Sequence, residues 1–167
     1  MDTISKGKIR CKKSFRGLNN FLRMTIQPLL PATIDDIVRI EKSSFSKAWT
    51  REDYLFFLNH ACGVSFGVFN SHGQLCSFII SLLVQGHMDI ISLATHPQYR
   101  RQGLAKLLLS HIEKCPGVRK IFLEVEMDNS PALSLYQQTG FSISGVRKRY
   151  YGGQKDAYAM MKAMNAQ

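Results

Sequence analysis

The stretch IISLATHPQYRRQGLAKLLLSHIEK, residues 90–114, indicates a strand, a short basic loop and an amphipathic helix, in that order. The apolar run 90–94 predicts the strand, and Pro97 ends it because proline lacks an amide hydrogen and restricts the residue before it. Apolar residues at 104, 107, 108 and 112 recur with helical spacing, so one face of the helix packs on a core. We expect function to lie where this strand meets this helix.

The loop between them has the features of an anion site. Gly103 stands at the start of the helix and Ala105 follows two residues later, so a ligand can approach the backbone closely. The first amides of a helix lack an internal acceptor, and the helix dipole places about half a positive charge there. Arg100 and Arg101 add cationic side chains. A nucleotide pyrophosphate would fit, although a capped helix with a solvated basic loop would show the same pattern.

The composition bounds the class of protein. The 167 residues are 45% hydrophobic, which suits one globular domain with a sizeable core. No apolar run reaches the roughly 18 residues of a membrane span, so no membrane contact is expected. The four cysteines show no paired short spacing, which favours reduced thiols in a cytoplasmic protein over a zinc site or a disulfide framework. The histidines form no metal-binding pair either, and we predict no metal.

Residues 1–23 form a basic N-terminal extension that we expect to be loosely held, and residues 24–167 form the single domain. Seven basic residues and one acidic residue give the extension +6 of the formal net charge of +10. It lacks the apolar core of a secretory signal. Its composition is compatible with an organellar transit peptide, with an arm that contacts RNA or the ribosome, or with a start codon upstream of Met24.

The remaining pattern predicts one mixed α/β (α+β) unit in the order βααβββαβαββ. Besides 90–94, we expect strands over 24–29, 62–69, 75–84, 118–126, 141–151 and 155–164. Thr33 and Thr50 are the expected N-caps of the first two helices. Ser130, followed by Pro131, is the expected N-cap of the last helix, which Gly140 ends.

Two acidic residues stand in apolar surroundings. Glu41 falls on the apolar stripe of the first helix, which comprises Ile34, Ile37, Val38 and Phe45. A buried carboxylate is costly unless paired or hydrated, so Glu41 is either satisfied by the fold or faces a substrate cleft. Glu124 lies in an expected interior strand, where partial burial would raise its pKa towards that of a general base. The alternative is a carboxylate that is solvated or paired with a basic group.

Aromatic residues offer further candidates. Trp49 lies on the connector between the first two helices and either lines a binding site or fills the core. Tyr136, on the inward face of the last helix, is either a core aromatic or an acid that points into a cleft. Arg149, Tyr150 and Tyr151 gather at the tip of the closing hairpin, where they would form a lid over a polar substrate.

From residue 24 onward the chain resembles the GCN5-related N-acetyltransferase (GNAT) superfamily. The acetyl-coenzyme A motif of that superfamily, Arg/Gln-x-x-Gly-x-Gly/Ala, is matched by Arg100, Gly103 and Ala105. The chain most resembles the bacterial ribosomal-protein-alanine N-acetyltransferases, the RimI type, through IEKSSFSKAW at 40–49, YRRQGLA at 99–105, FLEVEMDNSPALSLYQQTGF at 122–141 and RYYGGQKDAYAM at 149–160. It departs from that type at Ala105, where glycine is usual, and at Ala48, where proline is usual.

The resemblance implies a GNAT fold, a central mixed, mostly antiparallel twisted sheet of about seven strands flanked by four helices. It implies acetyl-CoA as co-substrate, bound by Leu93, Ala94, Thr95, Arg100, Arg101, Gln102, Gly103, Leu104, Ala105, Asn129 and Tyr136. Glu124 matches the general base, acting through water, and Tyr136 the acid that protonates the departing thiolate. The substrate groove would be bordered by Glu41, Trp49, Tyr150 and Tyr151.

The implied function is transfer of an acetyl group from acetyl-CoA to the N-terminal α-amine of a protein, namely a ribosomal protein that begins with alanine. The amine would attack the thioester directly in a ternary complex. Two alternatives stay open. One is a related acetyltransferase that acts on a small amine or a lysine side chain, and the other is a non-catalytic module that binds the ribosome or RNA.

Overall fold

The computed structural model describes residues 24–45 and 49–164. Within these ranges the helices and strands follow the predicted order, with two short 3-10 helices added, η1 (Pro31–Thr33) and η2 (Pro97–Tyr99). The basic extension predicted for residues 1–23 lies outside the described residues. Nowhere in the described ranges is a helix both long and apolar enough to cross a membrane.

Seven strands of the described residues form one sheet in the spatial order β1-β2-β3-β4-β5-β7-β6. They are β1 (Thr25–Pro28), β2 (Gly63–Phe69), β3 (Leu75–Val84), β4 (His87–Thr95), β5 (Lys120–Glu126), β6 (Ser142–Tyr151) and β7 (Lys155–Ala163). All neighbours are antiparallel except β4 and β5, which are parallel. The expected mixed, mostly antiparallel sheet is thus confirmed, with β7 placed between β5 and β6.

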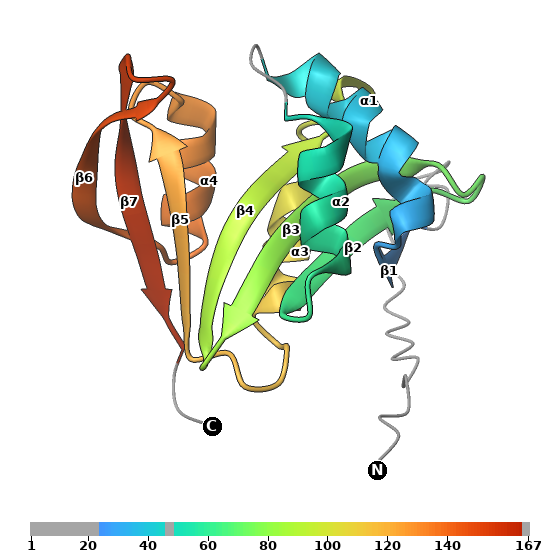
Figure 1. Ribbon diagram of the computed structural model, residues 1–167, viewed down its shortest axis with the longest axis horizontal. Coiled ribbons are helices and arrows are strands. Elements are labelled where there is room, and N and C mark those ends of the chain that lie inside the picture. Colours follow the sequence, from blue (N-terminus) through green and yellow to red (C-terminus); the bar gives the residue numbers. More distant parts are fainter. Residues whose placement is uncertain (1–23, 46–48, 165–167) are drawn as a thin grey trace.

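β4 and β5 pair only near their first residues. Three pairs join them, His87 with Lys120, Met88 with Ile121 and Asp89 with Phe122. Beyond these pairs the two strands diverge towards their carboxyl ends (Figure 1). β4 keeps β3 as its neighbour and β5 keeps β7, so the edges that face the gap have no strand partner among the described residues. The sheet therefore contains open backbone edges in its interior.

A β-bulge in β4 lies in the part of the strand that diverges. Ile80 of β3 pairs with Ser92 whereas Ser81 pairs with Ile90, so Ile91 is the extra residue. A bulge bends its strand and re-aims the side chains that follow. Ile91 packs with the core below α1 and α2, and the next residue, Ser92, contacts the same side of the sheet.

Helices of the described residues cover both faces of the sheet and enclose two separate cores. α1 (Ile34–Ser44) and α2 (Arg51–Asn59) lie on one face, and α3 (Leu104–Ile112) and α4 (Ser130–Gln138) on the other (Figure 1). Ile121, Leu123 and Val125 of β5 are buried in the core on the α3 and α4 side. Because side chains alternate along a strand, Glu124 faces the α1 and α2 side.

The helix ends differ in part from the prediction. Thr50 caps α2 in a capping box with Asp53, as expected. Thr33 does not cap α1 through its side chain, because its hydroxyl donates to the Leu30 carbonyl at 2.7 Å and η1 leads directly into the helix.

Two further positions correct the prediction. Asn129, rather than Ser130, caps α4, since its Oδ1 accepts the Ala132 amide at 3.2 Å. Phe45, expected on the apolar stripe of the first helix, is 40% exposed because α1 ends one residue before it. Ile40 is buried on that stripe instead.

Candidate active site

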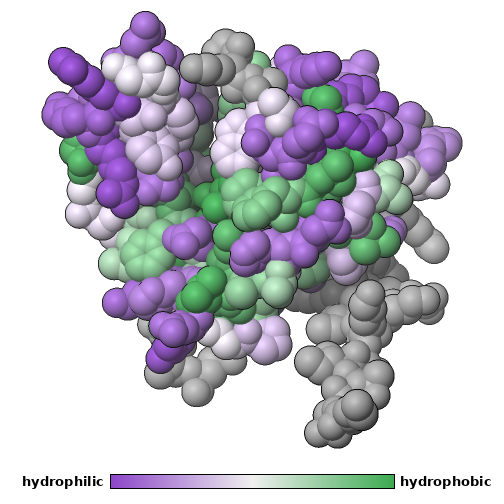
Figure 2. Space-filling view, in the orientation of Figure 1, coloured by the Kyte–Doolittle hydropathy of each residue, from purple (hydrophilic) through white to green (hydrophobic). Residues whose placement is uncertain are grey.

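The predicted site residues fall into three groups along the fold. One group comes from α1 and the connector to α2, one from β5, β6 and α4, and one from the amino end of α3. Figure 2 shows the α1 and α2 face, where apolar residues gather between the polar surface of the β6–β7 hairpin and that of α1.

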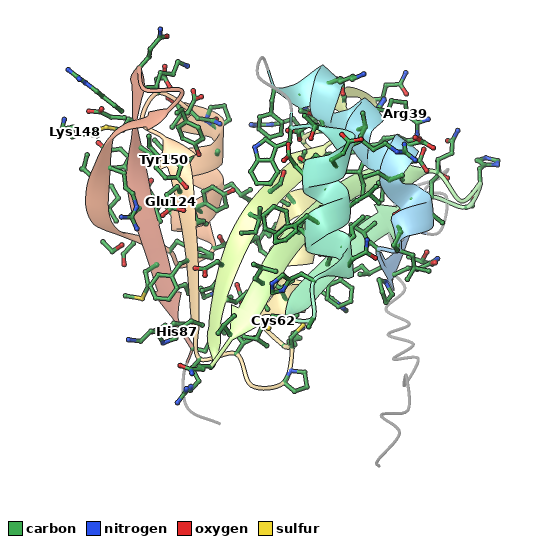
Figure 3. All side chains as sticks on the ribbon, viewed as in Figure 1. Arg39, Cys62, His87, Glu124, Lys148 and Tyr150 are labelled. Atoms are coloured by element: carbon green, nitrogen blue, oxygen red, sulfur yellow. The ribbon has the colours of Figure 1, made fainter. Side chains whose placement is uncertain are left out.

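Glu124 is held by a residue of β6. Its Oε1 accepts a hydrogen bond from Arg147 Nε at 3.0 Å, and its backbone carbonyl accepts the Tyr151 hydroxyl at 3.0 Å. The Glu124 side chain is 26% exposed. It is thus half-buried and paired with a basic group, which was one of the two alternatives for this residue. Because the Glu124 side chain is not fully buried, solvent can still reach its carboxylate. Figure 3 shows Tyr150 on the same side.

Tyr136 projects from α4 on the opposite face of the sheet. The residue is 8% exposed, and its ring packs at a steep angle on Phe141 with 5.7 Å between the centroids. Burial, with a further contribution from nearby Tyr151, raises the pKa of Tyr136. The hydroxyl therefore keeps its proton at neutral pH and can donate it.

Tyr150 and Tyr151 end β6 as two nearly perpendicular rings 5.1 Å apart. Burial, and then the neighbouring Tyr150, raise the pKa of Tyr151 to about 12. Burial also raises the pKa of Tyr150, followed by the charge of Glu124. Both phenols are therefore neutral hydrogen-bond donors beside the Glu124 carboxylate.

Glu41 is buried with one carboxylate oxygen unsatisfied. Only 3% of the residue is exposed. Oε1 accepts the Trp49 amide at 3.2 Å, whereas Oε2 has no hydrogen-bond partner among the described residues. Burial raises the pKa of Glu41, against smaller opposing effects of the Tyr54 hydroxyl and the Trp49 amide. The free oxygen is a strong acceptor for a donor or a cation.

Aromatic residues of α2 and the connector surround this carboxylate. Tyr54 is fully buried, and its hydroxyl lies 3.1 Å from Ser92 Oγ on β4. The Trp49 ring stacks on Phe57 at 5.4 Å and contacts Tyr54 at 5.6 Å, yet the residue is 38% exposed. Trp49 is therefore anchored on α2 and presents its remaining surface to solvent.

The amino end of α3 is open. Gly103, its N-cap, has a φ of +78°, and a methyl group at this position would meet no atom within 4 Å. Arg101 also has a positive φ, 61°, a strained backbone that is typical of binding sites. The Leu107 amide donates to the Gly103 carbonyl at 2.9 Å, and the amides of residues 102–106 have no backbone acceptor among the described residues. Leu104, which is buried, fixes this turn to the core.

The residues before this turn are held by hydrogen bonds. Buried Ser77 donates to the Ala94 carbonyl at 2.9 Å and lies 2.8 Å from Thr95 Oγ1. Leu93 packs partly buried against the core on the α3 side. The Arg100 guanidinium donates to the Thr95 carbonyl and to Ser44 Oγ, each at 3.2 Å. The side chain that the sequence assigned to a pyrophosphate is thus engaged by protein groups.

Four polar residues near the gap did not stand out in the sequence: Tyr54, Asp89, Ser92 and Arg147. Arg147 meets Glu124 across 23 positions of the chain, and no local pattern links the two. Asp89, at the last β4–β5 pair, has its pKa raised by burial and then by the charge of Glu124, against His87. In the described ranges no group of three or more His, Cys, Asp or Glu residues could hold a metal ion.

The arrangement can combine three tasks. The open turn of α3 can bind an anion, and the free edge of β4 can pair with an extended ligand. Glu124 and Tyr136 lie on opposite faces of the sheet, and a carboxylate can accept a proton whereas a phenol can donate one.

Known proteins resemble this chain in sequence. Residues 34–141 match the model of the Acetyltransferase (GNAT) family. A Bacillus subtilis (strain 168) protein, provisionally named ribosomal protein bS18-alanine N-acetyltransferase, is 32% identical over 136 residues, which cover 79% of this chain and 90% of that protein.

Solved structures share the fold. The ribosomal-protein-S18-alanine N-acetyltransferase from Escherichia coli has a TM-score of 0.80 at 27% identity, over 87% of this chain and 96% of that one. Arabidopsis thaliana NAA60, solved in complex with acetyl-CoA, has a TM-score of 0.77 at 21% identity, over 86% of this chain and 100% of that one. The second likeness concerns the fold alone.

Replacing Glu41 with glutamine should stabilise the protein at neutral pH. The pKa of Glu41 is raised in the folded state, so wild-type stability falls as the pH rises from about 4.3, the value for an unfolded glutamate, through the raised folded pKa. Glutamine cannot ionise and keeps an oxygen for the Trp49 amide. Thermal unfolding followed by circular dichroism should give similar Tm values near pH 4 and a higher Tm for Glu41→Gln at pH 7.5.

Glu52→Gln removes one negative charge from an exposed position of α2 and serves as the control. Its Tm should follow the wild type at every pH. A Glu41→Gln variant that also followed the wild type would mean that the Glu41 carboxylate is fully satisfied in the folded protein.

Proposed function

Because the chain belongs to the acetyltransferase (GNAT) family, we propose that it transfers the acetyl group of acetyl-CoA to the N-terminal α-amine of a protein. Family and relatives make it an acetyl-CoA-dependent N-acetyltransferase. The acceptor that we favour is a ribosomal protein that begins with alanine, since the B. subtilis and E. coli relatives are named for that reaction. The observation that supports the proposal is the divergence of β4 from β5, with Glu124 on the α1 and α2 side of β5 and Tyr136 on α4 at the other face of the sheet.

The coenzyme site would extend from α3 to the gap. The free amides of residues 102–105 and the Arg101 side chain would hold the pyrophosphate, and the open space at Gly103 leaves room for it. The free edge of β4 at residues 93–95 would pair with the pantetheine arm as an added strand would. Asn129 would lie beside that arm, with its amide nitrogen available because the cap of α4 uses only Oδ1.

The acceptor would bind on the α1 and α2 side. A protein α-amine has a pKa of about 7.7–8.0, so much of it is cationic at neutral pH. The free Oε2 of Glu41 would attract this cation, and Trp49, Tyr150 and Tyr151 would border the groove. A peptide would need an open groove here, whereas a small amine would need a closed pocket.

The bound ammonium would first lose one proton to solvent, because only the neutral amine can attack. Two proton transfers would follow. Glu124 would accept the next proton, from the attacking amine, through a water molecule, as the new C–N bond forms and the thioester C–S bond breaks. Tyr136 would donate its proton to the departing sulfur and recover one from Glu124 through water. Positioned proton transfer typically contributes about 10² to 10⁴ in rate, and backbone amides near residues 93–95 would stabilise the negative charge on the acetyl oxygen.

Three further parts of the proposal concern the whole chain. Residues 24–167 would act as one N-acetyltransferase domain in the cytoplasm. Residues 1–23, which lie outside the described residues, would add contact with the ribosome or RNA through their positive charge. Filter binding to RNA across a salt series, with and without these residues, tests this contact.

The function is tested by release of coenzyme A on mixing the purified protein with acetyl-CoA and a panel of acceptors. The panel contains short peptides that differ in their first residue, together with polyamines and free lysine. Turnover confined to a ribosomal peptide that begins with alanine is the expected result. Turnover on small amines alone would contradict the acceptor, and binding of acetyl-CoA without turnover on any acceptor would favour a binding module.

Gly103→Glu should abolish acetyl-CoA binding, because it places bulk and negative charge where the pyrophosphate would lie. Gly117→Glu is the matched control, since Gly117 also has a positive φ and open space around it but follows the opposite end of α3. Both variants carry the same backbone strain and charge. Calorimetry with acetyl-CoA should show loss of binding only for Gly103→Glu, and equal affinities would place the coenzyme elsewhere.

Glu124→Gln should lower turnover by about 10² to 10⁴. Arg147→Gln breaks the same ion pair but keeps the carboxylate, so its loss should stay below about tenfold. Initial rates with the best peptide compare the two. Equal losses would mean that Glu124 matters only as the partner of Arg147.

Tyr136→Phe should lower kcat by about 10² or more, because the departing thiolate loses its proton donor. The dissociation constant of acetyl-CoA should stay within about twofold of the wild type, since the ring and its packing on Phe141 remain. Tyr158→Phe, which removes a phenol hydroxyl on β7, should keep the wild-type kcat. An unchanged kcat in Tyr136→Phe would remove Tyr136 from the mechanism.

A further inference from the structure

Arg100 joins two parts of the chain that are far apart in sequence. Its Nε donates to the Thr95 carbonyl at the end of β4, and its Nη2 donates to Ser44 Oγ at 3.2 Å and approaches the Ser43 carbonyl at 3.5 Å. Ser43 and Ser44 form the last turn of α1. The arginine therefore ties the loop before α3 to the carboxyl end of α1.

The carboxyl end of a helix is a favourable place for a cation. Its last carbonyls have no partner within the helix, and the helix dipole makes this end negative. A guanidinium presents several donors in a rigid fork, so one side chain can hold a carbonyl, a hydroxyl and a second carbonyl together. Arg100 thus fixes the end of α1 relative to β4.

This turn of α1 also positions the acceptor side of the site. The Glu41 carbonyl accepts the Phe45 amide at 3.0 Å, and the Glu41 carboxylate accepts the Trp49 amide at 3.2 Å. A shift of the last turn would therefore move both the buried carboxylate and the connector that carries Trp49.

Arg101 differs from its neighbour. It is exposed, its backbone is left-handed, and its guanidinium has no hydrogen bond to the protein among the described residues. Of the two adjacent arginines, Arg101 is therefore the one whose side chain is free to meet an anion at the amino end of α3.

We propose that the two arginines divide the work, with Arg101 binding the coenzyme pyrophosphate and Arg100 acting as a positioning residue for the acceptor. Arg100 holds the end of α1 so that Glu41 and Trp49 keep their places in the groove. The Arg100 backbone directly precedes the turn at the amino end of α3. The loop that binds the coenzyme would therefore also hold the acceptor side of the site in place. This inference rests on the proposed function.

The test compares Arg100→Gln with Arg101→Gln. Arg101→Gln should weaken acetyl-CoA binding in calorimetry about tenfold, with a peptide KM close to that of the wild type. Arg100→Gln should show the opposite, an acetyl-CoA affinity within about threefold of the wild type and a peptide KM raised about tenfold. Arg100→Lys, which keeps the charge but not the fork, should fall between wild type and Arg100→Gln.

A second readout needs no turnover. Trp49 is the only tryptophan in the chain, so its emission reports the connector directly. Without substrates, Arg100→Gln should shift Trp49 emission to longer wavelength and increase its quenching by acrylamide, whereas Arg101→Gln should match the wild type. Arg100 is exposed, and far-ultraviolet circular dichroism should show that both variants fold.

The outcomes separate the two hypotheses. Wild-type protein that acetylates no peptide would overturn the proposed acceptor, and Trp49 emission with coenzyme affinity would still decide the role of Arg100. Loss of acetyl-CoA affinity in Arg100→Gln equal to that in Arg101→Gln, or unchanged Trp49 emission in Arg100→Gln, would overturn the division of work.

Discussion

The incomplete pairing of β4 with β5 is the constraint on which the rest of this structure depends. Three residue pairs hold the two halves of the sheet together, and the strands then diverge. Open backbone edges inside a sheet are unfavourable unless water or a ligand satisfies them. Each half remains stable because it has its own neighbours, β3 for β4 and β7 for β5, and its own helices. The architecture therefore leaves open backbone edges at the gap, where an extended ligand can pair, whatever side chains line it.

Side chains of β5 alternate between the two faces of the sheet, so its polar and apolar residues face opposite sides. Its apolar residues enter the core on the α3 and α4 side, so Glu124 faces the α1 and α2 side, while Tyr136 comes from α4 on the other. In the proposed mechanism the base and the acid therefore come from opposite faces of the sheet. Burial favours the neutral form of the Tyr136 hydroxyl, and Arg147 Nε donates a hydrogen bond to the Glu124 carboxylate.

Charged groups elsewhere in the site show a balance between stability and binding. Among the described residues the buried Glu41 has one oxygen without a hydrogen-bond partner, an arrangement that costs free energy unless a donor or a cation meets it. Arg100 is the opposite case, because its guanidinium is already hydrogen-bonded to the protein at the end of α1. In the proposed mechanism, the first residue contributes binding energy and the second contributes order.

Local patterns of the sequence determined the elements and much of their faces. The strand around 90–94, the helix that begins after Gly103 and the N-cap at Thr50 all depend on residues within a few positions of one another, and the structure agrees with each. The resemblance carried by Arg100, Gly103 and Ala105 also identified the family. Only the tertiary structure decided that β4 and β5 diverge and that Arg147 pairs with Glu124. It also decided that the Arg100 side chain contacts the end of α1 and not the turn at the amino end of α3. These contacts join residues from 23 to 57 positions apart, and periodicity cannot report them because it records which face a residue takes but not which residue it meets there.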